Sequence, residues 1–168
     1  PIKNGFFPLG SYKLAKGETA KVTISSKGAK GNAHVDAKGM DEAEELLSAV
    51  GDVVRLEEES QIDAVTGVSG SGPAYVFHMI ETMAAGGIAQ GLSPELALKL
   101  ATATVAGAGA LAKSADEGPD QLRINVTSPN GTTQAALDVL MNEQDGFPVL
   151  LKRAVGAAAD RSRELSNG

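Results

Sequence analysis

The apolar positions in residues 41–168 recur mainly with the period of an α-helix. Between Asp41 and Gly51 they fall three and four residues apart, on one face of a helix that the glycine ends. The short apolar run that follows, at 53–56, predicts a strand. Residues 37–60 are therefore expected to hold one helix and one strand, half of an α/β unit. The apolar helix positions are Ala43, Leu46, Leu47 and Val50.

Beyond Gln61 the periodicity predicts helices. Ser93 followed by Pro94 is a typical helix start, because the serine side chain caps the first turn and proline fits the first helical position. Gly91 lies where a helix commonly ends. We therefore expect a mainly α domain over residues 61–168. The predicted helices span about 72–89, 94–114, 119–125, 134–141 and 147–165.

The helix predicted over residues 94–114 is poor in side-chain bulk. Gly107 and Gly109 lie within it among several alanines. Glycine inside a helix costs roughly 0.8 to 1 kcal/mol relative to alanine, so two of them imply a compensating close approach of another backbone. We expect another helix to pack against this one, from the same chain or from a second copy.

Residues 1–38 differ from the remainder in both pattern and charge. Alternating runs at 12–14 and 21–25 predict the two strands of a β-hairpin. This segment carries a net charge of +5, whereas the rest of the chain carries −11. We predict three parts: a β-hairpin segment at 1–36, an α/β remnant at 37–60 and a helical domain at 61–168.

The predicted hairpin resembles the last strands of golvesin-like β-sandwich modules, which are attached to secreted carbohydrate-active proteins. The resemblance rests on residues 9–12 and 20–24. Two interpretations stay open for this basic segment. It is either a solvated hairpin without a ligand, or a module that binds a sugar or an acidic ligand.

Composition narrows the range of functions. The 168 residues include no cysteine, which excludes a disulfide scaffold, a thiolate metal site and a thiol nucleophile. The net charge of −6 argues against a nucleic-acid coat or a polybasic membrane anchor. The longest weakly polar stretch, 101–112, is short for a bilayer span, and the first residues lack the pattern of an export signal. We expect a cytoplasmic protein that binds no nucleic acid, membrane or metal.

Two stretches rich in small and hydroxyl-bearing residues precede predicted helices, at 68–75 and 127–133. The first-turn amides of a helix and its dipole attract a carboxylate or phosphate without an arginine. Asn130 is followed by glycine and tolerates left-handed backbone angles. The pattern alone leaves two alternatives, ordinary helix starts or anion sites. No Gly-x-Gly-x-x-Gly motif follows a strand, so no dinucleotide-binding fingerprint is visible.

The stretches DAVTGVSGSGPAYVF at 63–77 and VTSPNGTT at 126–133 resemble the two signature stretches of pyrroline-5-carboxylate reductases. The resemblance extends over about 32–165. That family reduces 1-pyrroline-5-carboxylate to L-proline with NADPH or NADH, the last step of proline biosynthesis. Its members join an N-terminal Rossmann domain to a helical domain that interleaves with a second copy. For residues 61–168 the resemblance implies a bundle like the C-terminal domain of 6-phosphogluconate dehydrogenase, in a homodimer or a higher oligomer.

The resemblance also implies site residues. The second stretch would hold the substrate carboxylate, and the first would line the imine ring of pyrroline-5-carboxylate or proline. Some relatives place a threonine at the position of His78, where a side chain can meet the imine nitrogen; the imidazole could donate a proton there, or simply pack against neighbours. The implied substrate-binding residues are Ser69, Ser71, Gly72, Pro73, Ser128, Pro129, Asn130, Gly131, Thr132 and Thr133.

This chain shows no recognisable form of the family's cofactor domain. Residues 1–31 do not resemble it, and only its final helix and strand are expected to remain. Hydride transfer requires the donor and acceptor carbons about 3 to 3.5 Å apart, so we expect the chain alone to be inactive. Three functions stay open: the substrate and dimerisation part of a reductase, a catalytically silent oligomerisation scaffold, or a binding module that acts through the basic hairpin.

Overall fold

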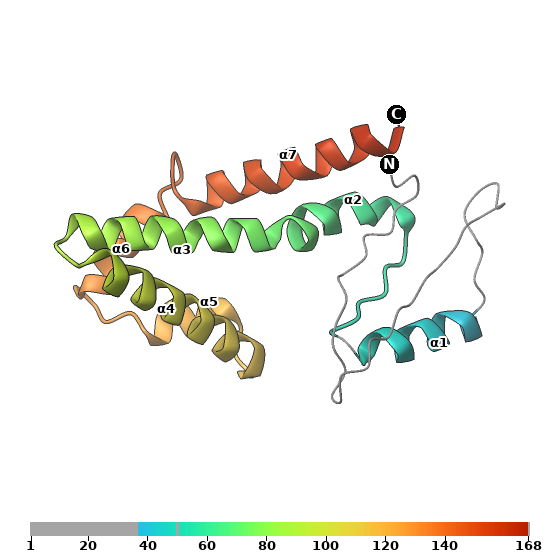
Figure 1. Cartoon of the computed structure of the whole chain (residues 1–168), viewed down its shortest axis with the longest axis horizontal. Coiled ribbons are helices and arrows are strands. Elements are labelled where there is room, and N and C mark those ends of the chain that lie inside the picture. The colour runs from blue at the N-terminus through green and yellow to red at the C-terminus, as the bar shows by residue number, and fades with distance from the viewer. Residues whose placement is uncertain (1–36, 50, 168) are drawn as a thin grey trace. The chain divides into compact units, whose positions relative to one another are not determined.

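The computed structural model describes residues 37–49 and 51–167, so the hairpin predicted within 1–36 lies outside the described part. The chain divides into two compact units, Pro1–Glu59 and Ser60–Gly168. Figure 1 shows the described elements, all of them helical.

The first unit contains helix α1, Ala37–Ser48, which begins before the predicted start at Asp41. Because of this earlier start, the first turn of α1 contains no acidic residue. The strand predicted at 53–56 was wrong, because these residues have no regular secondary structure. A strand needs a neighbour to share its backbone hydrogen bonds. The described residues contain no other strand that could serve as that neighbour.

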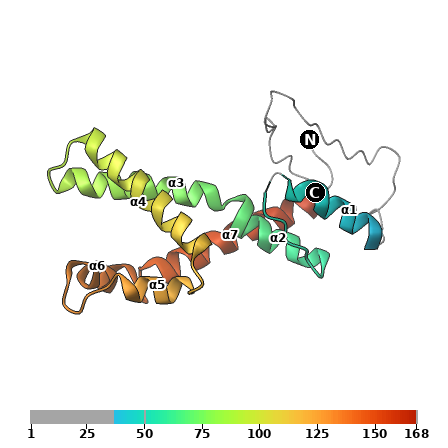
Figure 2. The same ribbon diagram turned by 90° about the horizontal axis from the view of Figure 1, so that it is seen from below.

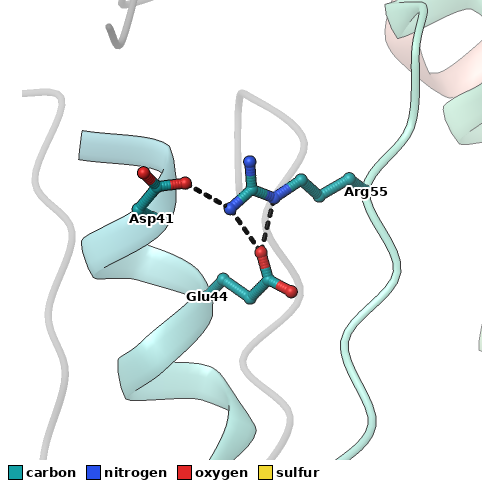
Figure 3. A network of polar contacts seen from close by, with 3 residues as sticks. All are labelled: Asp41, Glu44 and Arg55. Atoms are coloured by element: carbon teal, nitrogen blue, oxygen red, sulfur yellow. Dashed lines mark hydrogen bonds and ion pairs between the residues drawn. The ribbon is translucent and has the colours of Figure 1, made fainter. Parts of the chain in front are cut away.

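Arg55 holds the irregular segment of this unit to α1 (Figure 3). Its guanidinium donates to Asp41 Oδ1 over 2.6 Å and, through Nε, to Glu44 Oε2 over 2.5 Å. The hydrogen bond to Asp41, and then that to Glu44, raises the pKa of Arg55 above its ordinary value. All three side chains are largely exposed, so solvent screens the pair and its contribution to stability is small.

The second unit is built from helices alone in its described part. α2, the π-helical turn η2 and α3 follow one another almost without a break, and α4 folds back along α3 (Figures 1 and 2). A 3₁₀ turn, η1, spans Glu59–Gln61 at the boundary of the two units. The elements are α2 Ile62–Val65, η2 Thr66–Gly70, α3 Gly72–Ala89, α4 Pro94–Ser114, α5 Pro119–Asn125, α6 Thr132–Leu140 and α7 Phe147–Asn167.

Most of these helices follow the sequence pattern. The bounds of α3, α4 and α5 match the predicted spans, and α7 begins at the predicted residue. Ser93 caps α4 as expected, because its Oγ accepts from the amide of Leu96 over 3.3 Å. α6 begins at Thr132 rather than 134, since Gly131 is already in the extended conformation of an N-cap residue.

A close crossing of α3 and α4 forms the small buried cluster of this unit. Gly91, at φ 96°, makes the turn between the two helices. A Cβ on Gly87 would lie 3.3 Å from the Cβ of Ala97, so the glycine lets the helix backbones approach closely. The buried residues of the cluster are all alanines: Ala84, Ala97 and Ala101.

α7 packs against α2 and η2 in a second close contact. A Cβ on Gly67 would lie 2.7 Å from the backbone oxygen of Val155, so only glycine fits at this position. Ala159, on the same face of α7, is buried. Ser162 Oγ donates to Asp63 Oδ1 over 2.6 Å and ties the two elements together.

Few other apolar side chains of the described residues are covered. Phe77, Val139 and Leu165 are 64%, 71% and 66% exposed, and no large side chain within 37–49 and 51–167 is fully buried. Gly107 and Gly109 of α4 have open space where a Cβ would lie, so no helix among the described residues makes the close approach predicted there. A single copy therefore leaves wide apolar faces without a partner.

α4 is also long and apolar enough to cross a membrane, judged by length and composition alone. The sequence analysis had expected no such span. A helix that packs between other helices is apolar for the same physical reason, and α4 already packs against α3 in this chain.

Candidate functional site

The first signature stretch, at 63–77, is helical where its glycines and serines favoured a loop. Residues 66–70 form a π-helical turn that carries α2 on into α3. The amide of Ser71 donates to the carbonyl of Thr66, five residues earlier, over 2.8 Å. The start of α3 is therefore not a free helix N-terminus. The side chains of this stretch project from a widened helical turn.

Tyr75 contacts this turn from α3. Its hydroxyl donates to the carbonyl of Gly67 over 3.0 Å, in a partly buried position. Gly67 is buried, whereas Ser69 is exposed and Ser71 is half-buried. Gly72 and Pro73, the other predicted site residues here, occupy the first turn of α3. Ser69 and Ser71 therefore lie on a turn whose buried residue, Gly67, is held in place by packing.

The second signature stretch forms a tight turn that leads into α6. The amide of Gly131 donates to the carbonyl of Ser128 over 3.0 Å, with Pro129 and Asn130 between them. Asn130 has φ 60°, the left-handed conformation that its sequence predicted and that a type II turn requires at this position. The left-handed backbone conformation expected for Asn130 is therefore confirmed.

The start of α6 leaves backbone donors available. Gly131 is the N-cap residue and has no side chain to accept from the first-turn amides. Ser128 and Thr132 are exposed beside them, and Thr133 is half-buried. Free amides at a helix N-terminus can hold a carboxylate oxygen, and neighbouring hydroxyls can add donors. Thr127 is held in place, since its Oγ1 donates to the carbonyl of Arg123 over 2.6 Å.

His78 lies on α3, beyond the first signature stretch. Its Nδ1 is 3.0 Å from Glu81 Oε2, and its side chain is 75% exposed. The ring is thus oriented by a carboxylate on its own helix and is not enclosed by this chain. The structure shows an exposed imidazole that a ligand or a second copy could reach.

One copy of the chain does not bring the two stretches together. The first stretch packs through η2 against α7 and α2, whereas the second joins α5 to α6. In Figures 1 and 2, α5 and α6 lie away from the junction of α2 with α3. No hydrogen bond between the two stretches is present in the described part of the chain.

An apolar pocket of 310 Å³ lies between α5, α6 and the start of α7. It contains almost no polar surface, so it suits an apolar side chain better than a carboxylate. The sequence analysis did not identify this pocket, because its residues come from three separate segments. They are Arg123, Leu137, Leu140, Met141, Phe147, Pro148 and Leu151.

Comparisons with known proteins show to which family the chain belongs. The family model "Pyrroline-5-carboxylate reductase dimerisation" matches residues 59–165. A pyrroline-5-carboxylate reductase from Pseudomonas aeruginosa is 47% identical over 135 residues, covering 80% of this chain and 49% of that protein. One from Synechocystis is 43% identical over 164 residues, covering 98% of this chain and 60% of that protein.

The Synechocystis match reaches into residues 1–36, beyond the region where the sequence analysis found a resemblance. Among solved structures, a pyrroline carboxylate reductase from Plasmodium falciparum with NADP bound is 30% identical, with a TM-score of 0.69. The similarity covers 80% of this chain and 50% of that one. The chain spans about half the length of several of the relatives it matches. It belongs to the pyrroline-5-carboxylate reductase dimerisation family.

Proposed function

We propose that this chain is the substrate-binding and dimerisation part of a pyrroline-5-carboxylate reductase, which reduces 1-pyrroline-5-carboxylate to L-proline. The observation that carries the proposal is the turn at 128–131, which leads into α6 with no side chain capping its amides. It lies within the segment that the family model matches. A site of this kind holds a small carboxylate through the backbone.

Self-association is the first part of the proposed function. Phe77 and Val139 are mostly exposed, and the glycines at 107 and 109 face open space. Leaving such side chains in water forgoes roughly 1.5 to 3 kcal/mol for each large one, so a second copy that covers them would stabilise the fold. We therefore propose a homodimer in which helices of one copy pack against α4 of the other.

The substrate site forms between copies in this proposal. Within one chain the two signature stretches lie apart. The second stretch offers donors for the carboxylate, and the first offers side chains that would line the ring. The amides of Thr132 and Thr133 would hold the carboxylate, while Ser69 and Ser71 of the other copy would line the ring. His78 would supply the proton that the imine nitrogen gains on reduction.

The hydride that reduces the imine carbon comes from NADPH or NADH in this family. The sequence of this chain contains no Gly-x-Gly-x-x-Gly motif, and none of its residues is proposed to bind the cofactor. The chain by itself should therefore bind the substrate or product without turning it over.

Calorimetric titration of the full chain with L-proline, and separately with NADPH, tests this proposal. Proline binding without NADPH binding supports a substrate-binding part that holds no cofactor by itself. Dimerisation without proline binding favours the silent scaffold. Tight NADPH binding would contradict the assignment, because a cofactor site would then exist in this chain.

A further inference from the structure

The π-helical turn at 66–70 widens the backbone next to the predicted ring-lining residues. In a regular α-helix the amide of Ser71 would donate to the carbonyl of Gly67, four residues earlier. Here it donates to Thr66, and the Gly67 carbonyl accepts from the Tyr75 hydroxyl over 3.0 Å instead. Tyr75 thus satisfies the carbonyl that the π-helical turn leaves without its α-helical donor.

We propose that Tyr75 is a positioning residue that locks this π-helical turn and thereby fixes how Ser69 and Ser71 are presented. The lock concerns the backbone of this chain alone. Its consequence for ligand affinity rests on the proposed function, in which the two serines line the substrate ring.

The packing of the turn determines which residues would move if the hydrogen bond from Tyr75 to Gly67 were lost. Gly67 is pressed against α7, where a Cβ would meet the Val155 oxygen at 2.7 Å. Just before the turn, Asp63 accepts from Ser162 over 2.6 Å. The turn is therefore pinned at Gly67 and the helix before it at Asp63, so a change of register has to be absorbed further along, at 69–71.

A change from π to α geometry would alter the presentation of both serines. Successive residues in a helix are about 100° apart around the axis, since 3.6 residues make one turn. A π turn holds one residue more than an α turn, so a change of its hydrogen bonds to the α register rotates what precedes the turn by about that angle relative to α3. Ser69 would then face a different side of the helix from the one it now faces.

Tyr75→Phe tests the lock by removing the hydroxyl and keeping the ring. Thr82→Val is the matched control: it removes a hydroxyl from α3 that bonds only carbonyls of its own helix, those of His78 and Met79. Hydrogen exchange by mass spectrometry would follow the peptide covering 66–72. Calorimetry would measure the Kd for L-proline, and sedimentation and thermal melting would report the assembly and the global fold.

For Tyr75→Phe we expect exchange in 66–72 to accelerate about five- to tenfold, as for the loss of one partly buried hydrogen bond. The proline Kd should rise about three- to tenfold, with Tm and mass close to the parent values and Thr82→Val unchanged. Unchanged exchange in Tyr75→Phe would overturn the lock. Altered exchange with an unchanged proline Kd would overturn the positioning role. If the parent chain binds no proline, the proposed function fails, and exchange still decides whether Tyr75 locks the turn.

Discussion

Replacing Thr132 by proline tests whether a backbone amide grips the ligand. Proline removes the N–H and leaves the rest of the first turn intact, because the first helical position has no helical partner for that amide. The change suits the local backbone: Thr132 is the first residue of α6, and Gly131 before it has φ −85° and ψ 175°. A residue that precedes proline prefers this extended region.

The expected loss follows from the charge on the acceptor. A hydrogen bond to a charged group contributes about 1.5 to 3 kcal/mol, which corresponds to roughly a ten- to 150-fold rise in the Kd for L-proline. Thr132→Ala is the matched variant, since it removes the hydroxyl and keeps the amide. Thr132→Pro removes the amide as well as the hydroxyl, so Thr132→Ala should bind proline more tightly than Thr132→Pro by the contribution of the amide alone.

Calorimetry on the parent and both variants gives the three Kd values, and thermal melting checks that α6 remains folded. Equal proline affinity in Thr132→Pro and Thr132→Ala, with both folded, would refute the reasoning. The carboxylate would then be held elsewhere, and the free amides of α6 would be an ordinary helix start.

Three further changes test packing and assembly. Gly67→Ala should lower the free energy of unfolding by about 1 to 3 kcal/mol, because its Cβ would meet a carbonyl of α7 at 2.7 Å, whereas Gly86→Ala, in open space, should not destabilise; denaturant titration compares the two. Gly107→Leu should weaken self-association measured by sedimentation, and an unchanged dimer would show that α4 does not pack closely there. Ser162→Ala should cost about 1 kcal/mol in thermal unfolding, and Ser166→Ala, whose hydroxyl bonds only its own helix, should cost less; equal losses would contradict a tie between α7 and α2.

The sequence predicted the helices of the second unit well, because their signals are local. Ser93 and Pro94 mark the start of α4, and the left-handed Asn130 follows from its place in the turn. These features depend on residues a few positions apart. Local pattern therefore sufficed for most helix bounds and for the backbone conformation of Asn130.

The strand at 53–56 and the first signature stretch could not be predicted in the same way. An apolar run forms a strand only beside another strand, and the described part of the chain has none. The π-helical turn depends on Tyr75 and on close packing of Gly67 against α7, nearly 90 residues further along the chain. Glycine and serine in the sequence favoured a loop, and tertiary contacts decided otherwise.

Sedimentation equilibrium of the full chain tests whether a second copy covers the apolar faces of this one. A homodimer predicts a species of twice the chain mass of 17.1 kDa that persists on dilution. A monodisperse, folded species at the mass of a single chain would contradict it.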